Sequence, residues 1–168
     1  MRWNRLFVAG TAMLALGGVA HAVEPIGVTR AVGIAERVTG GRVIEVDLDV
    51  RNGNRLVYEI DAATGRSLQE IEIDAYSGAV LSRSKAHLET YWYRLSGKGA
   101  LDAARRSKPL SQMLAALEKE TDGQVMDVDF EYEDGQIRYE VEIATRAGIA
   151  GIYMDPATGK RLSFVIDD

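Results

Sequence analysis

Apolar residues recur with the period of an α-helix in two separate parts of the chain. In each part they stand at positions i, i+3, i+4 and i+7, which places them on one face of a helix. The two sets are Val28, Ala31, Val32, Ala35 and Val38, and Leu110, Met113, Leu114 and Leu117. Gly40-Gly41 and Asp122-Gly123 end the two predicted helices, and Ser107 is the candidate N-cap of the second one.

Each predicted helix is followed by a stretch in which apolar and polar residues alternate. A period of two with one polar face is typical of a half-buried antiparallel strand. Asn52-Gly53 and Asp134-Gly135 are strong hairpin signals, so each stretch is expected to turn back and pair with the next one. The positions expected to face inward on the first strand of each hairpin are Ile44, Val46, Leu48 and Val50, and Met126, Val128, Phe130 and Tyr132.

A third and a fourth strand are expected in each half of the chain. They fall near residues 68–74 and 79–83, and near residues 149–155 and 160–166. The turns between them begin with Asp74 and Asp155 and end with Gly78 and Gly159. Aspartate can accept backbone N–H groups in such a turn and glycine supplies a positive φ, so these four residues are interpreted as structural.

The two halves read as a tandem repeat. Gly41 to Val50 aligns with Gly123 to Tyr132, 82 residues later, and Tyr58-Glu59-Ile60 aligns with Tyr139-Glu140-Val141 at an offset of 81. The sequence therefore predicts an α+β fold of two tandem repeats, each with one helix packed on a small antiparallel sheet. Two arrangements stay open at this point: the units dock sheet to sheet, or they sit apart on a linker.

The N-terminus has the layout of a secretory signal peptide. Arg2 and Arg5 precede an uncharged apolar run from Leu6 to Val19, and Ala20-His21-Ala22 is a small-x-small cleavage site. The run is too short to cross a bilayer, so we expect cleavage after residue 22 and no membrane span afterwards. The expected location is the periplasm or the surrounding medium.

Composition excludes several classes of function. The chain has 168 residues and no cysteine, which excludes disulfides, thiolate metal sites and cysteine nucleophiles. The leader carries two arginines and no acidic residue, so its removal lowers the formal net charge from −5 to −7. Because binding to nucleic acid requires a basic surface, no nucleic-acid partner is expected.

The helix and strand patterns resemble those of the PepSY domain family. The segment Ile71 to Leu81 is similar to the family's closing sequence Val-Asp-Ala-x-Thr-Gly-x-Val-Leu. Supporting elements are the helix opening Ile26-Gly27-Val28, the Gly40-Gly41 stop and the strand Val57 to Ile60. A second and more divergent copy includes Tyr139 to Glu142 and Met154 to Leu162, so the two copies cover about residues 26–83 and 109–166.

The resemblance implies a small, usually extracytoplasmic α+β domain of cystatin-like type. The family occurs in propeptides of secreted metallopeptidases and in envelope proteins, where it is proposed to inhibit peptidases or to control local protease activity. It has no set of catalytic residues. The expected division of the chain is a signal peptide (1–22), a first repeat (23–85), a linker (86–108) and a second repeat (109–168).

Carboxylates that face one another across the hairpins are the sharpest chemical feature. A two-residue turn at Asp134-Gly135 places Asp127 opposite Glu142 and Asp129 opposite Glu140. The first hairpin places Asp47 opposite Glu59 and Glu45 opposite Asp61. Like charges in direct opposition destabilise a hairpin. The face either binds a basic partner or a hard cation such as Ca²⁺, or is a solvated surface that tolerates the repulsion and blocks aggregation.

Three adjacent aromatic residues, Tyr91-Trp92-Tyr93, precede Arg94 in the expected linker. Tryptophan, tyrosine and arginine dominate protein-binding hot spots, so this cluster is a candidate partner anchor. The alternative is that these side chains pack the linker onto its own domains.

Catalytic machinery is not expected. His87 is the one histidine left after the leader, and the chain contains no Gly-x-Ser-x-Gly nucleophile elbow and no phosphate-binding loop. The paired carboxylates are expected on a solvent-facing surface, where burial does not tune their pKa values. The sequence therefore predicts a non-enzymatic protein without a cofactor that inhibits or modulates a peptidase or an envelope sensor protein. The alternative is an envelope protein that binds divalent cations through its acidic sheet faces.

Overall fold

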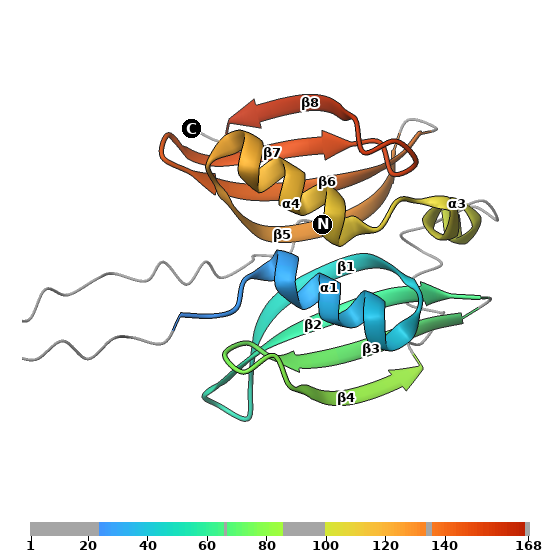
Figure 1. Ribbon diagram of the computed structural model, residues 1–168, viewed down its shortest axis with the longest axis vertical. Helices are drawn as coiled ribbons and strands as arrows, with labels where there is room; N and C mark the ends of the chain where they lie inside the picture. The colour runs from blue at the N-terminus through green and yellow to red at the C-terminus, as the bar shows by residue number, and fades with distance from the viewer. Residues whose placement is uncertain (1–23, 66, 86–99, 134–135, 167–168) are drawn as a thin grey trace, which may run out of the picture.

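The computed structural model describes residues 24–65, 67–85, 100–133 and 136–166. In these residues eight strands form one antiparallel sheet in the order β4-β3-β2-β1-β5-β6-β7-β8. Figure 1 shows helices α1 and α4 lying on the same face of this sheet. The fold is therefore α+β, as predicted. The expected signal peptide (1–22) and the cluster Tyr91, Trp92, Tyr93 and Arg94 lie outside the described residues.

Both halves have the same order of elements. The first half contains α1 (Val28–Thr39), β1 (Arg42–Arg51), β2 (Arg55–Thr64), β3 (Ser67–Asp74) and β4 (Val80–Lys85). The second half contains α4 (Leu110–Thr121), β5 (Gln124–Glu133), β6 (Gln136–Thr145), β7 (Gly148–Met154) and β8 (Arg161–Ile166). A further short helix, α3 (Ala100–Arg106), precedes the second half.

The two halves join edge to edge through β1 and β5. These strands pair antiparallel at Glu45↔Asp129 and Val46↔Val128. Both arrangements left open by the sequence are therefore wrong, since the units neither stack their sheets nor sit apart. The physical reason is that β1 and β5 are each the outer strand of a four-stranded half. Their unpaired backbone groups satisfy each other and remove two exposed sheet edges.

The core lies between the two helices and the face of the sheet that they cover. The apolar faces predicted from the helical period are buried, apart from Val38, which is 38% exposed. Strand residues such as Val46, Ile60, Val128 and Val141 are fully buried beneath them. Each fully buried aliphatic side chain contributes about 1.5–3 kcal/mol, so this layer is the main source of stability.

Polar contacts tie the halves together at the junction. The hydroxyl of Tyr139, a fully buried residue of β6, donates to the carbonyl oxygen of Val43 in β1 at 2.7 Å. The Glu36 carboxylate of α1 accepts the first free N–H of α4, from Leu110 at 2.7 Å, and also the hydroxyl of Ser111. An acidic group at a helix N-terminus is favourable because of the helix dipole. The first half thus supplies the cap of the second helix.

Ser107 does not cap α4, contrary to the sequence-based prediction. Pro109 occupies the N-cap position and makes no side-chain hydrogen bond there. The buried Ser107 hydroxyl instead donates backward to the carbonyl of Ala104 at 2.6 Å, at the end of α3. The sequence pattern could not reveal the acceptor that replaces it, because Glu36 lies 74 residues before Leu110.

Helix α3 lies in the range that the sequence assigns to a linker. Its residue Ala104 is 1% exposed and belongs to the common core. The Arg42 side chain of β1 donates from Nε to the carbonyl oxygen of Ser107 at 2.9 Å. The end of the expected linker is therefore packed onto the first half rather than solvated.

Several residues predicted to face inward are exposed. Leu48, Val50, Met126 and Tyr132 are between 41% and 49% exposed. Leu48, Val50 and Tyr132 lie toward the hairpin ends of β1 and β5, beyond the middle of the sheet that the helices cover. Met126 lies at a register shift between Val125 and Asp127, where Val125 takes the buried position.

The Tyr139 hydroxyl generates a stability prediction. Tyr139→Phe leaves the buried carbonyl of Val43 without its donor, so the free energy of unfolding should fall by about 1–2 kcal/mol. Urea denaturation of the full chain measures this change. The same substitution at Tyr132, which is 45% exposed, should change stability by less than about 0.5 kcal/mol. Equal effects of the two substitutions would contradict the assigned junction contact.

Candidate functional site

The face of the sheet opposite the helices carries rows of carboxylates. We call this surface the acidic face and define it by Glu45, Asp47, Asp49, Glu59, Asp61, Glu70, Glu72, Asp127, Asp129, Glu131, Glu140 and Glu142. Each of these residues has intermediate exposure. They occupy the alternate positions whose neighbours point into the core, because successive strand side chains point to opposite faces.

Like charges stand directly opposite each other, as the sequence predicts. Asp127 pairs with Glu142 and Asp129 pairs with Glu140 between β5 and β6. The first hairpin shows Glu45 opposite Asp61 and Asp47 opposite Glu59. All four candidate residues of the second half therefore lie together on one surface.

The junction of the halves extends this pairing into one acidic row. Asp129 lies opposite Glu45 across the β1–β5 pair, and Asp61 lies opposite Glu70 across the β2–β3 pair. Together with the hairpin pairs, this gives a row of five carboxylates across five strands, in the order Glu70, Asp61, Glu45, Asp129 and Glu140. Adjacent strands lie about 4.8 Å apart, so these charges are close neighbours.

Asp61 is the most perturbed member of this row. Burial, followed by the negative charges of Glu45, Glu70, Glu59 and Asp47, raises the pKa of Asp61 to about 8. Among the described residues, its buried Oδ1 atom has no hydrogen-bond partner. The expectation that burial leaves these carboxylates untuned is therefore wrong. The reason is that Asp61 lies on an inner strand, flanked by side chains of both neighbours.

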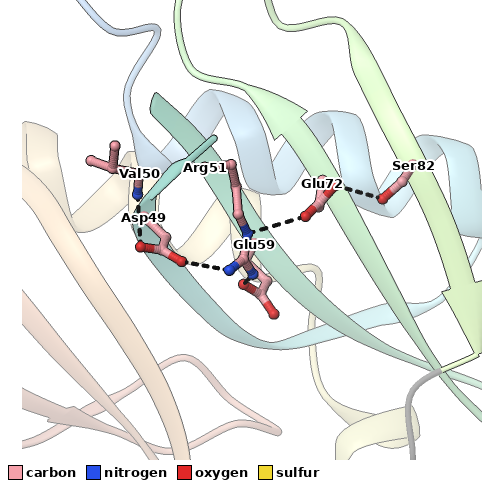
Figure 2. Close-up of polar contacts among 6 residues, drawn as sticks. All are labelled: Asp49, Val50, Arg51, Glu59, Glu72 and Ser82. Atoms are coloured by element: carbon pink, nitrogen blue, oxygen red, sulfur yellow. Dashed lines mark hydrogen bonds and ion pairs between the residues drawn. The ribbon is translucent and has the colours of Figure 1, made fainter. Parts of the chain in front are cut away.

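Arg51 neutralises one end of the acidic face in the first half (Figure 2). Its guanidinium lies 2.9 Å from Asp49 and 3.3 Å from Glu72, and it forms a close ion pair with Glu59. The Ser82 hydroxyl of β4 donates to the other oxygen of Glu72 at 2.9 Å. Burial nevertheless raises the pKa of Glu59, against the opposing effect of Arg51.

Arg138 has a related position in the second half. Its Nη2 atom lies 3.5 Å from Glu131, the residue directly opposite it across the β5–β6 pair. The guanidinium also stacks on Tyr153, with 3.9 Å between Cζ and the ring centroid. The Tyr153 hydroxyl donates to Glu140 at 3.0 Å. Burial, followed by the charge of Glu140, raises the pKa of Glu131.

The arrangement supplies negative charge rather than a chelating cage. Within residues 24–65, 67–85, 100–133 and 136–166, no three acidic or histidine side chains converge as ligands of one metal ion. None of the helices in the described part of the chain has the length and apolar character that a membrane crossing requires.

The closing turns have the structural role that the sequence predicts. Asp74 Oδ1 accepts the backbone N–H and the hydroxyl of Ser77 at 2.9 and 2.8 Å. These hydrogen bonds lower the pKa of Asp74 to about 2. Asp155 accepts the same two groups from Thr158 at 2.7 and 2.5 Å. Gly78 and Gly159 adopt φ values of 73° and 71°.

Sequence reasoning missed Asp61 and Arg51 as special members of the acidic face. The first hairpin register already placed Asp61 opposite Glu45, but it did not supply Glu70 or the second half as neighbours. The alternation of the strand identifies Arg51 only as a polar, outward-facing position. Its three acidic partners come from β1, β2 and β3, which only the folded sheet brings together.

The raised pKa of Asp61 generates a prediction for stability against pH. Because the folded state binds this proton more tightly than the unfolded state, the free energy of unfolding should fall as pH rises from about 4 to about 8. Asp61→Asn removes this titration. The variant should exceed the wild type by about 1–3 kcal/mol at pH 8 and match it near pH 4. Urea denaturation between pH 4 and pH 9 measures the difference.

The control for this measurement is Asp49→Asn. Asp49 lies on the same face, but its side chain is 46% exposed and paired with Arg51, so its substitution should leave the slope of stability against pH in place. Parallel pH profiles for Asp61→Asn and the wild type would contradict the assignment.

The chain is similar to solved structures and, over one segment, to a protein family. Two solved structures resemble the chain: a candidate lipoprotein (CD1622) from Clostridium difficile 630 and the YpmB protein from Bacillus subtilis. The first is 18% identical, with 84% of this chain and 92% of that chain covered and a TM-score of 0.42. The second is 15% identical, with 86% and 100% covered and a TM-score of 0.36. No curated protein sequence matches the chain.

The family comparison is specific to one segment. Residues 25–83 match the PepSY family model, described as peptidase propeptide and YPEB domain. This segment runs from the residues before α1 into β4, which is nearly the whole first half. Residues 25–83 are therefore a PepSY domain.

Proposed function

We propose that the protein is an exported, non-enzymatic binding protein that inhibits or modulates a peptidase or another protein of the cell envelope. The observation that carries the proposal is the PepSY domain at residues 25–83, because this family is often linked to peptidase regulation. The signal-peptide pattern of residues 1–22 supports a periplasmic or secreted location.

The acidic face is the proposed contact surface for a basic partner. Its central row passes through both halves, so one partner can contact five adjacent strands of the sheet. Complementary charge accelerates encounter and selects partners, and its effect weakens as salt increases. A partner bound to this face is inhibited sterically, because the sheet then covers the cleft of the partner.

The second half is proposed to be a second, diverged PepSY-like unit. It has the same order of one helix and four strands, and both its helix and its hairpin follow the sequence offset described above. In this proposal the two units act as one surface, because β1 and β5 join their sheets.

The experiment begins with crosslinking in intact cells and mass spectrometry of the captured proteins. A captured peptidase is then purified and titrated with residues 23–168 at low and at physiological salt. Its rate should fall as the complex forms, and the complex should weaken with increasing salt. The double variant Asp129→Asn with Glu140→Gln should weaken binding about three- to tenfold.

A matched control carries the same loss of charge away from the acidic face. Glu24→Gln with Asp122→Asn alters two exposed residues and should leave the affinity within about twofold. The proposal is abandoned if no peptidase or other envelope protein is retained at physiological salt. Calorimetric titration with Ca²⁺ and Mg²⁺ tests the cation-binding alternative, which requires saturable binding that is lost in the Asp129→Asn, Glu140→Gln variant.

A further inference from the structure

The two halves have the same local arrangement, in which a helix packs beside a closing turn. In the first half, Ile26 donates its backbone N–H to a carbonyl of the turn that follows β3, at 2.8 Å. In the second half, Lys108 stands 82 residues later and donates to the corresponding turn at 3.0 Å. The space between helix and turn can therefore be compared directly.

In the first half this space is filled by two isoleucine side chains. A Cβ atom added at Gly78 would lie 3.1 Å from Cδ1 of Ile34 and 3.4 Å from Cδ1 of Ile26. The two methyl groups thus lie against the glycine of the turn, and they fill the space between the helix and the turn. Glycine is favoured here, since its φ is +73° and an added Cβ atom would press on the Ile34 methyl group.

In the second half the corresponding space is left partly open. Lys108 replaces Ile26, and its ammonium is held away on the turn by a 2.7 Å hydrogen bond to the Thr158 carbonyl. Ala116 replaces Ile34 and supplies only a methyl group. Met113 approaches Gly159 and fills part of the gap.

A groove of about 280 Å³ remains between α4, the second closing turn and the start of β8. Met113, Leu117 and Met154, each at most 5% exposed, form its apolar wall. Lys108 lies at its rim, as does the ion pair of Arg161 with Glu120, which measures 3.1 Å. The groove has the chemistry of a pocket for one aliphatic side chain, and its counterpart shows such a side chain in place.

The sheet edge beside this groove is also unlike its counterpart. In the part of the chain that the structure describes, β4 and β8 are the two ends of the sheet. The edge strand β4 carries Arg83 and Lys85, which is a common protection against pairing with other chains. The strand β8 has Phe164 and Ile166 at the corresponding positions, and no charged residue follows Arg161 within it.

Apolar side chains of β8 lie next to the groove. Phe164 is 47% exposed and lies opposite the buried Ile152, so it shares the helix-covered face of the sheet with the groove. Leu162, next to the groove residue Arg161, is 49% exposed. An extended segment paired with β8 would cover these side chains, and the groove lies where such a segment can insert one of its own.

We propose that β8 and the adjoining groove form a docking site for an extended polypeptide segment of a partner protein, anchored by a branched aliphatic side chain in the groove. The proposal rests on the proposed function, and it adds a second contact surface on the opposite face and outer edge from the acidic face. We infer an aliphatic anchor because Ile26 and Ile34 fill the corresponding space in the first half.

The test uses the protein from residue 23 to 168, labelled with ¹⁵N, and a synthetic pentapeptide of alternating threonine and isoleucine. NMR shift changes on titration should map to Met113, Leu117, Met154 and β8. The same peptide with alanine in place of isoleucine should bind about tenfold more weakly.

Two matched variants locate the site. Ala116→Ile restores the filling of the first half, so it should abolish the shifts while the protein stays folded. Ala115→Ile makes the same change at an exposed neighbour that does not line the groove, and it should leave binding unchanged. An Ala116→Ile spectrum that retains native dispersion excludes unfolding as the cause of a loss.

The outcomes separate this proposal from the function proposed above. Absence of peptide binding, shifts confined to other strands, or binding that survives Ala116→Ile would overturn the docking site. Peptide binding with no envelope partner retained would support the docking site and reject the peptidase-directed function. A captured partner whose affinity is equal for the wild type and for Ala116→Ile would support the function and reject the docking site.

Discussion

The pairing of β1 with β5 is the constraint on which the rest of this structure depends. Only two residue pairs, Glu45↔Asp129 and Val46↔Val128, define it in the ladder. It turns two four-stranded halves into one sheet and places both helices on the same face. The Tyr139 hydroxyl bond to Val43 and the Glu36 cap of α4 follow from this placement, because they join groups that lie far apart in the sequence. The pairing also extends the acidic row through both halves.

The same constraint gives the molecule two different surfaces. The face without helices concentrates carboxylates, and burial, followed by repulsion from these neighbours, raises the pKa of Asp61. Arg51 and Arg138 offset this repulsion in each half. The covered face is apolar and ends at two unlike edges, since β4 carries charged residues whereas β8 carries Phe164 and an adjoining groove. The two halves therefore differ at their outer edges.

The sequence was sufficient for the features that depend on short-range patterns. Periodicity located the helices and strands, and the hairpin turns fixed the registers that place Asp127 opposite Glu142 and Asp129 opposite Glu140. The Asp74 and Asp155 turns followed from local hydrogen-bonding chemistry. Features that depend on long-range contacts could not be predicted from the sequence. These include the edge-to-edge junction, the capping of α4 by Glu36 rather than Ser107, and the burial of Asp61, since each requires neighbours from separate segments of the chain.

The most direct test is to introduce cysteines at Glu45 and Asp129 together, because the chain contains no cysteine and these residues lie opposite each other across the junction. Oxidation of the purified monomer should form an intramolecular disulfide, seen as loss of both free thiols and faster migration on a non-reducing gel. Cysteines at Asp49 and Asp129 lie on the same strands in the wrong register and should stay reduced. Free thiols in the Glu45→Cys, Asp129→Cys variant, or equal crosslinking of both pairs, would contradict the joined sheet.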